Sequence, residues 1–148
     1  TFLDSDLQLR TLPAADLKMG YRTSLFEENH DWCILSATVV LRHGDGAVVL
    51  ARMQELLGRR KDKQPLEWPS AGSTFKRPQG AFAGKLIEEC GLRGFTVGGA
   101  QISEKHCGFV INRGGATCAD VVALTEQVSR IVRDKTGFVL EREIRVVR

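Results

Sequence analysis

The middle of the chain reads Pro69-Ser70-Ala71-Gly72-Ser73-Thr74-Phe75-Lys76-Arg77-Pro78-Gln79-Gly80. Gly72 allows a positive φ or a close approach of the backbone to a ligand. Pro69 and Pro78 stiffen both ends, and each pushes its preceding residue toward an extended conformation. A serine hydroxyl on such a rigid turn is a candidate proton donor, and Lys76 with Arg77 could neutralise a phosphate. Composition alone favours a structural turn with a solvated basic exit, so residue types leave both interpretations open.

Periodic patterns predict the elements on either side of this stretch. Strands are predicted over 2–4, 7–12, 33–41, 95–103, 108–112 and 138–147, and helices over 14–19, 47–60, 81–90 and 117–136. Each of the longer helices carries an apolar stripe expected to face inward. The stripes are Val49, Met53, Leu56 and Leu57; Phe82, Leu86, Ile87 and Cys90; and Val121, Leu124, Val128, Ile131 and Val132. Thr117 and Asp120 form a capping-box pattern that begins the last helix, and Gly137 ends it.

These elements predict an α+β protein in two parts. A β-rich part precedes residue 58, and a compact βαββα-like part spans 59–138. The final strand, 139–148, returns toward the first part, with Leu140, Ile144 and Val146 on one face and Glu141, Glu143 and Arg145 on the other. The boundary falls where the helix ends in the charged run 59–63 before Pro65, and cations suit the negative end of a helix dipole.

Composition sets limits on the class of protein. The chain has 148 residues, 43% of them hydrophobic and 26% charged, with a net charge of +3, which is typical of a soluble globular protein. Its four cysteines show no CxxC pair and suit buried thiols in a reducing cytosol. No apolar run reaches membrane-spanning length, and no leader opens the chain. Because the chain begins at Thr1, we expect it to be a fragment of a longer protein.

Other kinds of chemistry have weaker support. A serine hydrolase would use Ser73 with His106 as base and Asp120 or Glu104 as the orienting carboxylate, but the serine lacks the Gly-x-Ser-x-Gly elbow. No His, Cys or Asp cluster has metal-ligand spacing, so we expect no metal site. Rossmann and P-loop glycine patterns are missing, and the basic residues are not interleaved with aromatics as in nucleic-acid-binding proteins. Glu143 and Arg22 are otherwise ordinary solvated residues.

A family resemblance changes which of these interpretations is favoured. The stretch 70–78 resembles the signature of the UDP-N-acetylenolpyruvoylglucosamine reductases, flavoenzymes of bacterial peptidoglycan synthesis. Three more stretches resemble the family in order, so that the similarity covers essentially the whole chain. They are Gly20-Tyr21-Arg22-Thr23-Ser24, Gly98-Gly99-Ala100-Gln101-Ile102-Ser103-Glu104-Lys105-His106 and Leu140-Glu141-Arg142-Glu143-Ile144-Arg145.

The resemblance implies roles for particular residues. It makes Ser73 the donor of a proton to the enolpyruvyl group, with Arg22 and Glu143 at the substrate carboxylate. It places Lys63 near the nucleotide diphosphate with help from Arg59. Further substrate contacts are implied for the following residues: Tyr21, Lys76, Arg77 and His106. The cofactors would be FAD and NADPH, the substrate UDP-N-acetylglucosamine enolpyruvate, and the location the cytoplasm, with no nucleic acid or membrane as partner and the oligomeric state left open.

The sequence departs from the family in three respects. The Gly-rich flavin-binding region of the family lies outside these residues. We therefore expect residues 1–58 to be the end of the flavin domain. We also expect this chain alone to hold no FAD firmly and to be inactive. The strand over 33–41 runs directly into the next helix, as in the branch of the family with a short loop. Arg77 stands where some relatives have asparagine. A UDP-sugar-binding module without catalysis is the main alternative function.

Overall fold

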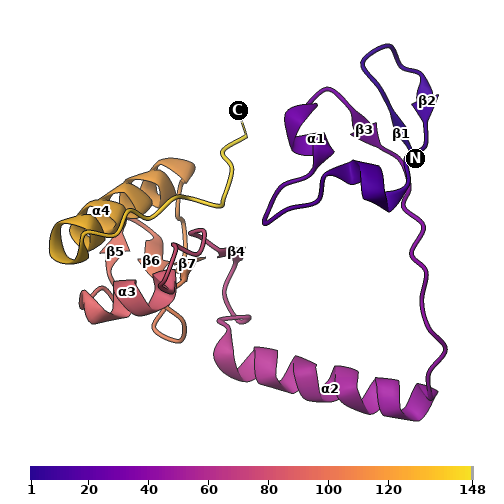
Figure 1. Ribbon diagram of the computed structural model, residues 1–148. Coiled ribbons are helices and arrows are strands. Elements are labelled where there is room, and N and C mark those ends of the chain that lie inside the picture. Colours follow the sequence, from indigo (N-terminus) through magenta and orange to yellow (C-terminus); the bar gives the residue numbers. More distant parts are fainter. Residues whose placement is uncertain (148) are drawn as a thin grey trace. The chain divides into compact units, whose positions relative to one another are not determined.

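The computed structural model describes residues 1–147. Contacts divide the chain into two compact units, Thr1–Asp45 and a second that begins at Gly46 (Figure 1). Both units combine helices with antiparallel strands, which confirms the α+β class. The predicted division at residues 58 and 59 concerned a flavin domain and a substrate domain, and it stays a prediction.

The first unit is a three-stranded sheet with two short helices. Strand β1 (Phe2–Leu3) lies between β2 (Leu9–Arg10) and β3 (Cys33–Ile34), and both neighbours are antiparallel to it. The helices are η1 (Ala14–Leu17) and α1 (Leu25–Glu28), the second of which was not predicted. Phe2 is buried between two aromatic rings, with ring centroids 4.6 Å from Trp32 and 5.3 Å from Phe26.

Asp4 organises the turn between β1 and β2. Its carboxylate accepts a 2.8 Å hydrogen bond from Nε of Arg10 and others from the backbone N–H groups of Asp6 and Gln8. These bonds, that from Arg10 first, lower the pKa of Asp4. The strands predicted over 2–4 and 7–12 therefore form and pair with each other, but both are shorter than the pattern indicated.

The predicted strand over 33–41 is wrong beyond Ile34. Its neighbour β1 begins at Phe2, and the Thr1 carbonyl accepts hydrogen bonds from the N–H groups of both Leu35 and Ser36. The ladder ends there, because residues 35–41 have no strand beside them among the described residues. Their alternating side chains are exposed on both sides.

The second unit has a four-stranded antiparallel sheet in the order β4-β7-β6-β5. The strands are β4 (Ser70–Ser73), β5 (Thr96–Val97), β6 (Ala100–Ile102) and β7 (Phe109–Asn112). Helix α4 (Cys118–Thr136) lies against β5 and β6, and α3 (Ala83–Glu89) packs beside α4 (Figure 1). The core between them contains residues with no measurable exposure: Ile87, Ala100, Ile102, Leu124, Val128 and Val132.

Helix α4 follows its prediction closely. The Thr117 side chain accepts a hydrogen bond from the N–H of Asp120, and the Asp120 carboxylate accepts one from the N–H of Thr117, which completes the capping box. Gly137 ends the helix with a φ of 77°. Leu124, Val128 and Val132 form the buried stripe, so the apolar periodicity of this segment correctly predicted which face of the helix is buried.

Two predicted strands of this unit were wrong in extent. The segment 95–103 is two strands, β5 and β6, because Gly98 takes a φ of +54° and turns the chain. A Cβ at Gly98 would lie 2.3 Å from Oδ1 of Asp120, so this turn packs directly on the cap of α4. The segment 138–147 forms no continuous strand, because its pairing is limited to one bridge, between Phe75 and Arg142.

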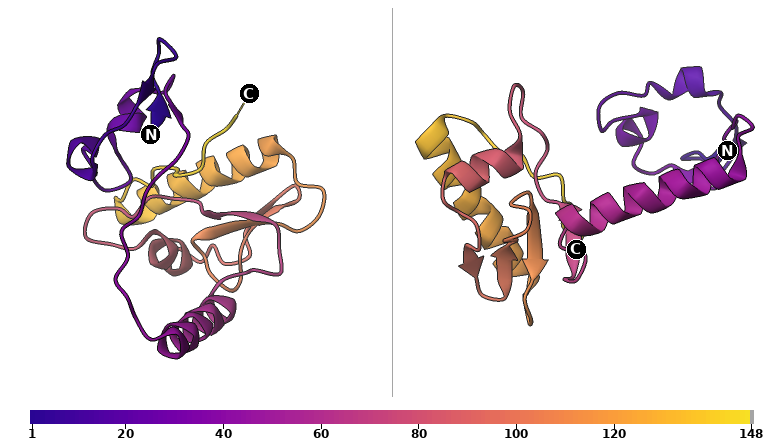
Figure 2. Two further views of the ribbon diagram at one scale, coloured as in Figure 1. Left: turned by 90° about the vertical axis from the view of Figure 1, so that its right-hand side faces the viewer. Right: turned by 90° about the horizontal axis from the view of Figure 1, so that it is seen from below.

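One predicted apolar face and one residue predicted to lie in the core are also exposed. Helix α2 (Gly46–Lys63) is straight (Figure 2). It has no buried residue, so Val49, Met53, Leu56 and Leu57 face solvent in this chain. Phe82 was predicted to face the core, but it is 57% exposed, because it is the N-cap of α3 and lies outside the helical repeat. No helix within residues 1–147 has the length and apolar character needed to cross a membrane.

Candidate functional site

Ser73 is the last residue of β4, at the edge of the sheet. The stretch that the sequence predicted as a rigid turn forms a strand here, because β7 lies beside it and pairs Ser73 with Phe109. The register shifts between Ser70 and Ser73, and Gly72 takes a φ of 86° at this irregularity. Such irregularities re-aim the side chain that follows them. Ser73 is exposed at this point.

Thr74 holds the end of β4 in place. It is 2% exposed, and its N–H donates to the Gly108 carbonyl over 2.9 Å. Its Oγ1 accepts from the Val110 N–H over 3.0 Å, and its carbonyl accepts from the Glu143 N–H over 2.9 Å. Sequence reasoning missed this residue, because a threonine between a serine and a phenylalanine carries no signal of burial.

The C-terminal segment runs along the motif through the same short ladder. Beside the Thr74–Glu143 bond, the N–H of Lys76 donates to the Glu141 carbonyl over 2.8 Å, and Phe75 bridges to Arg142. The Lys76 ammonium also pairs with the Glu141 carboxylate. Two of the three predicted catalytic residues, Ser73 and Glu143, therefore belong to adjoining backbone segments although they are far apart in sequence.

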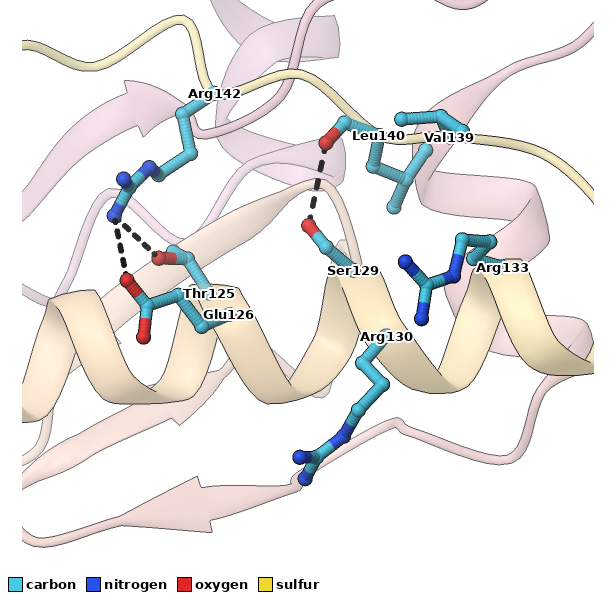
Figure 3. Close-up of a pocket in the computed structure, with 8 residues that line it drawn as sticks. All are labelled: Thr125, Glu126, Ser129, Arg130, Arg133, Val139, Leu140 and Arg142. Atoms are coloured by element: carbon cyan, nitrogen blue, oxygen red, sulfur yellow. Dashed lines mark hydrogen bonds and ion pairs between the residues drawn. The ribbon is translucent and has the colours of Figure 1, made fainter.

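Arg142 shows which way the C-terminal segment faces (Figure 3). Its guanidinium points to α4, where Nη1 lies 3.4 Å from Oγ1 of Thr125 and 3.9 Å from Oε1 of Glu126. Ser129 donates a 3.3 Å hydrogen bond to the Leu140 carbonyl and fixes the segment to the same helix. A cavity of about 430 Å³ lies here. Because alternate residues of an extended segment face opposite sides, Glu143 is on the side away from α4.

Arg22 and Tyr21 lie in the first unit, on a tight turn closed by the Gly20–Thr23 bridge. Arg22 has a φ of 57°, which is uncommon for a residue with a side chain and costs conformational energy. Its guanidinium carbon is 5.9 Å from the centre of the Tyr21 ring, and both residues are exposed. Arg22 and Ser73 belong to different units, and an approach of Arg22 to Ser73 stays a prediction.

The other predicted substrate contacts have varied surroundings. Arg59 forms an ion pair with Glu55 at 2.5 Å, one turn earlier in α2. Lys63 is the exposed last residue of that helix. The guanidinium carbon of Arg77 lies 4.0 Å from the centre of the Phe82 ring. These placements leave each cation at the surface but do not bring all of them to one point.

His106 is arranged unlike the base of a serine hydrolase. Its Nδ1 accepts a hydrogen bond from the Gly108 N–H over 3.0 Å, and its ring packs edge-on against Phe109. A neutral imidazole that accepts at Nδ1 carries its proton at Nε2, so neither nitrogen is left to accept a proton from Ser73. No hydrogen bond joins Ser73 to His106 within residues 1–147. Asp120 is committed to the cap of α4, so the geometry argues against the hydrolase.

A metal centre also lacks support. Within the part of the chain that the structure describes, no three His, Cys, Asp or Glu side chains are grouped to hold a metal ion. Cys90 and Cys107 are buried free thiols, and burial raises the pKa of Cys107 above its ordinary value.

Fold and site together define an α+β domain whose C-terminal segment places a glutamate beside a serine-bearing edge strand. Comparisons with known proteins then identify the family. Residues 64–147 match the family described as UDP-N-acetylenolpyruvoylglucosamine reductase, C-terminal domain. The chain belongs to this family.

Relatives extend the similarity to the whole chain. Two relatives are UDP-N-acetylenolpyruvoylglucosamine reductases from Lachnoclostridium phytofermentans and Caldanaerobacter subterraneus. Over 98% of this chain's length, they are 50% and 47% identical to it. The crystal structure of the reductase from Thermus caldophilus aligns with 88% of the chain at a TM-score of 0.73 and 34% identity. The chain covers 46% of the first and third of these proteins and 48% of the second, so it spans about half the length of its relatives.

Proposed function

We propose that the complete protein carrying this chain reduces UDP-N-acetylglucosamine enolpyruvate to UDP-N-acetylmuramate in peptidoglycan synthesis, in the cytoplasm. The family membership and the ladder that joins Thr74 to Glu143 support this proposal. In it, residues 59–138 form the substrate-binding domain, 1–58 the end of the flavin domain, and 139–148 the segment that returns toward the flavin domain. The direct connection between residues 41 and 46 favours the short-loop branch of the family.

The chemistry requires a proton at the carbon next to the substrate carboxylate. When hydride reaches the other carbon of the enolpyruvyl double bond, the electron pair of that bond moves toward the carboxylate and creates an enolate. Arg22 stabilises this charge, because a fixed cation placed where negative charge develops lowers the barrier. Ser73 Oγ then gives its proton to the adjacent carbon, and a replacement proton must reach the serine for the next turnover.

Glu143 is the second group that we assign to the substrate carboxylate. Its backbone is anchored to Thr74, the neighbour of Ser73, so both side chains are carried by one hydrogen-bonded pair of segments. That arrangement fixes their relative position before the substrate arrives. Such preorganisation spares the reaction the cost of orienting the two groups.

FAD and NADPH are the cofactors that this proposal requires, and reduced flavin would supply the hydride. The cavity next to the Ser73 motif is small for a flavin. The cavity beside the motif, lined in part by Ser70, Ala71 and Ile144, has a volume of about 220 Å³, below the roughly 300–1,000 Å³ of ordinary ligand pockets. We assign flavin binding to the remaining length of the protein.

An assay of the complete protein tests the proposal. We expect NADPH oxidation that depends on UDP-N-acetylglucosamine enolpyruvate, with UDP-N-acetylmuramate as product. The alternative, a UDP-sugar-binding module without catalysis, would bind the nucleotide sugar and leave NADPH unchanged. Glu143→Gln is the matching variant for the site, because it keeps the shape of the side chain and removes its charge.

A further inference from the structure

Arg77 and Phe82 form a stacked pair just after the motif. The guanidinium carbon of Arg77 lies 4.0 Å from the centre of the Phe82 ring. At this distance the positive group is attracted to the negative face of the ring. Phe82 is 57% exposed and is the N-cap of α3, where it makes no side-chain capping hydrogen bond. The ring therefore neither packs in the core nor caps the helix, and the contact that it makes is with the Arg77 guanidinium.

The charge of Arg77 is also available to a ligand. Lys76, the adjoining cation, is paired with the carboxylate of Glu141. Among residues 1–147 no carboxylate forms an ion pair with Arg77, and its side chain is exposed. A guanidinium without a carboxylate partner, held over the face of a ring, presents its donors in a fork that matches the oxygens of a phosphate.

A stacking partner is needed here because arginine is long. An arginine side chain has several rotatable bonds, and fixing them on binding costs conformational entropy. A ring that already restrains the guanidinium reduces the entropy lost when the ligand binds.

We propose that Phe82 is a positioning residue, which holds Arg77 in the orientation that contacts the diphosphate of a nucleoside diphosphate sugar. This inference rests on the proposed function for the identity of the substrate. It assigns Phe82 to ground-state binding, because the diphosphate is remote from the carbon atoms that react. Loss of the ring should therefore change KM and leave kcat unchanged.

The test is a double-mutant cycle in the complete protein with Phe82→Leu, Arg77→Ala and the double variant. Phe82→Leu should raise KM for UDP-N-acetylglucosamine enolpyruvate about two- to fivefold, the value expected for an exposed cation–π contact. Arg77→Ala should raise KM at least as much, and Phe82→Leu should add nothing in that background. Phe82→Tyr should restore the KM of the unmodified protein, because tyrosine keeps the aromatic face.

Arg113→Ala is the matched control. Arg113 stacks on Trp68 at the same 4.0 Å, and neither residue is among the substrate contacts assigned above, so the variant removes one charge and one comparable stacked pair. Its KM should not change. Calorimetric titration with UDP gives a second reading of the same cycle that needs no turnover. Thermal unfolding of Phe82→Leu at the temperature of the unmodified protein verifies that the fold is intact.

Independent, additive effects of the two substitutions would overturn the inference, as would a fall in kcat with KM unchanged. A Phe82→Leu variant with the KM of the unmodified protein would do the same. None of these outcomes affects the proposed function, which is judged by turnover of the unmodified protein. If the unmodified protein shows no turnover, the proposed function fails, and the cycle measured with UDP decides the role of Phe82.

Discussion

Thr74 is the residue on which the geometry of the site depends most directly. It is buried next to the exposed Ser73, and its Oγ1 is the acceptor for the N–H of Val110. Thr74→Val keeps the shape of the side chain but leaves that N–H without a partner, which costs about 1–3 kcal/mol when the group is buried. Thr74→Ser keeps the acceptor and should cost less. Urea unfolding of the three proteins measures the difference, and equal stability of Thr74→Val and the unmodified protein would contradict the role assigned to this hydrogen bond.

At the residue scale, the sequence identified candidates but not their surroundings. Ser73 and Glu143 were singled out by family resemblance, since an exposed serine and a solvated glutamate are ordinary by their residue types. The Phe82 side chain was assigned to the core because helical spacing from Leu86 places it on the buried face. That spacing applies only inside a helix, and Phe82 has an extended conformation at the N-cap. Contacts across the chain, such as that between Thr74 and Glu143, leave no trace in local spacing.

The cap of α4 gives a prediction at the scale of elements. Hydrogen bonds from Thr117, first from its backbone N–H, lower the pKa of Asp120 below its ordinary value of 3.8. A carboxyl group whose pKa is lower in the folded state stabilises the fold above its unfolded pKa, and this contribution is lost as pH falls through the folded pKa. Asp120→Asn should therefore unfold at a lower temperature than the unmodified protein at pH 6, with a difference that shrinks below about pH 3.8. A difference independent of pH would assign the effect to packing against Gly98.

Thr117→Ala tests the other half of the same cap. Removing the hydroxyl leaves the N–H of Asp120 without its acceptor, so we expect a loss of about 1 kcal/mol at neutral pH. Chemical denaturation measures this value, and Thr117→Ser, which keeps an acceptor, is the control. A Thr117→Ala variant as stable as the unmodified protein would show that solvent replaces the cap.

Elements were predicted well where their signals are local. The capping box, the apolar stripe and Gly137 together define α4, and all three are properties of neighbouring residues. Strands depend on a partner: residues 35–41 alternate as a strand does but have none beside them among the described residues, and 138–147 pairs over a single bridge. The stripe of α2 predicted an amphipathic helix, and the helix forms, yet no residue in it is buried.

At the scale of the whole molecule, the chain is about half the length of the relatives that it matches. The exposed apolar face of α2 includes Leu50, Met53, Leu56 and Leu57, beside a hollow of about 610 Å³. Exposed apolar patches of this kind are uncommon on proteins that function alone. The proposed function requires a flavin site, which we assign to the length of the protein that this chain does not cover.

We therefore predict that this chain, purified alone, is colourless and does not oxidise NADPH. The cavity beside the Ser73 motif is small for a flavin, and we assign flavin binding to the remaining length of the protein. Hydride transfer from NADPH to the substrate requires that bound flavin. Absorbance between about 350 and 500 nm, where flavins absorb, would be measured on the chain alone. The complete protein is the positive control. A yellow preparation of the chain with one FAD per molecule would show that the division of labour proposed for the two halves is wrong.

The central claim is that Ser73 gives the proton in the complete protein, and stopped-flow absorbance of the flavin tests it most directly. Reduction by NADPH does not involve the serine, so Ser73→Ala should leave that half-reaction at its normal rate. Reoxidation by the enolpyruvyl substrate should slow by roughly 10²–10⁴-fold, the usual contribution of a positioned general acid. Ser73→Cys should recover part of the rate, because a thiol of similar reach can donate a proton. Reoxidation of Ser73→Ala at the rate of the unmodified protein would contradict the claim and reduce the Gly72–Ser73 strand end to a structural feature.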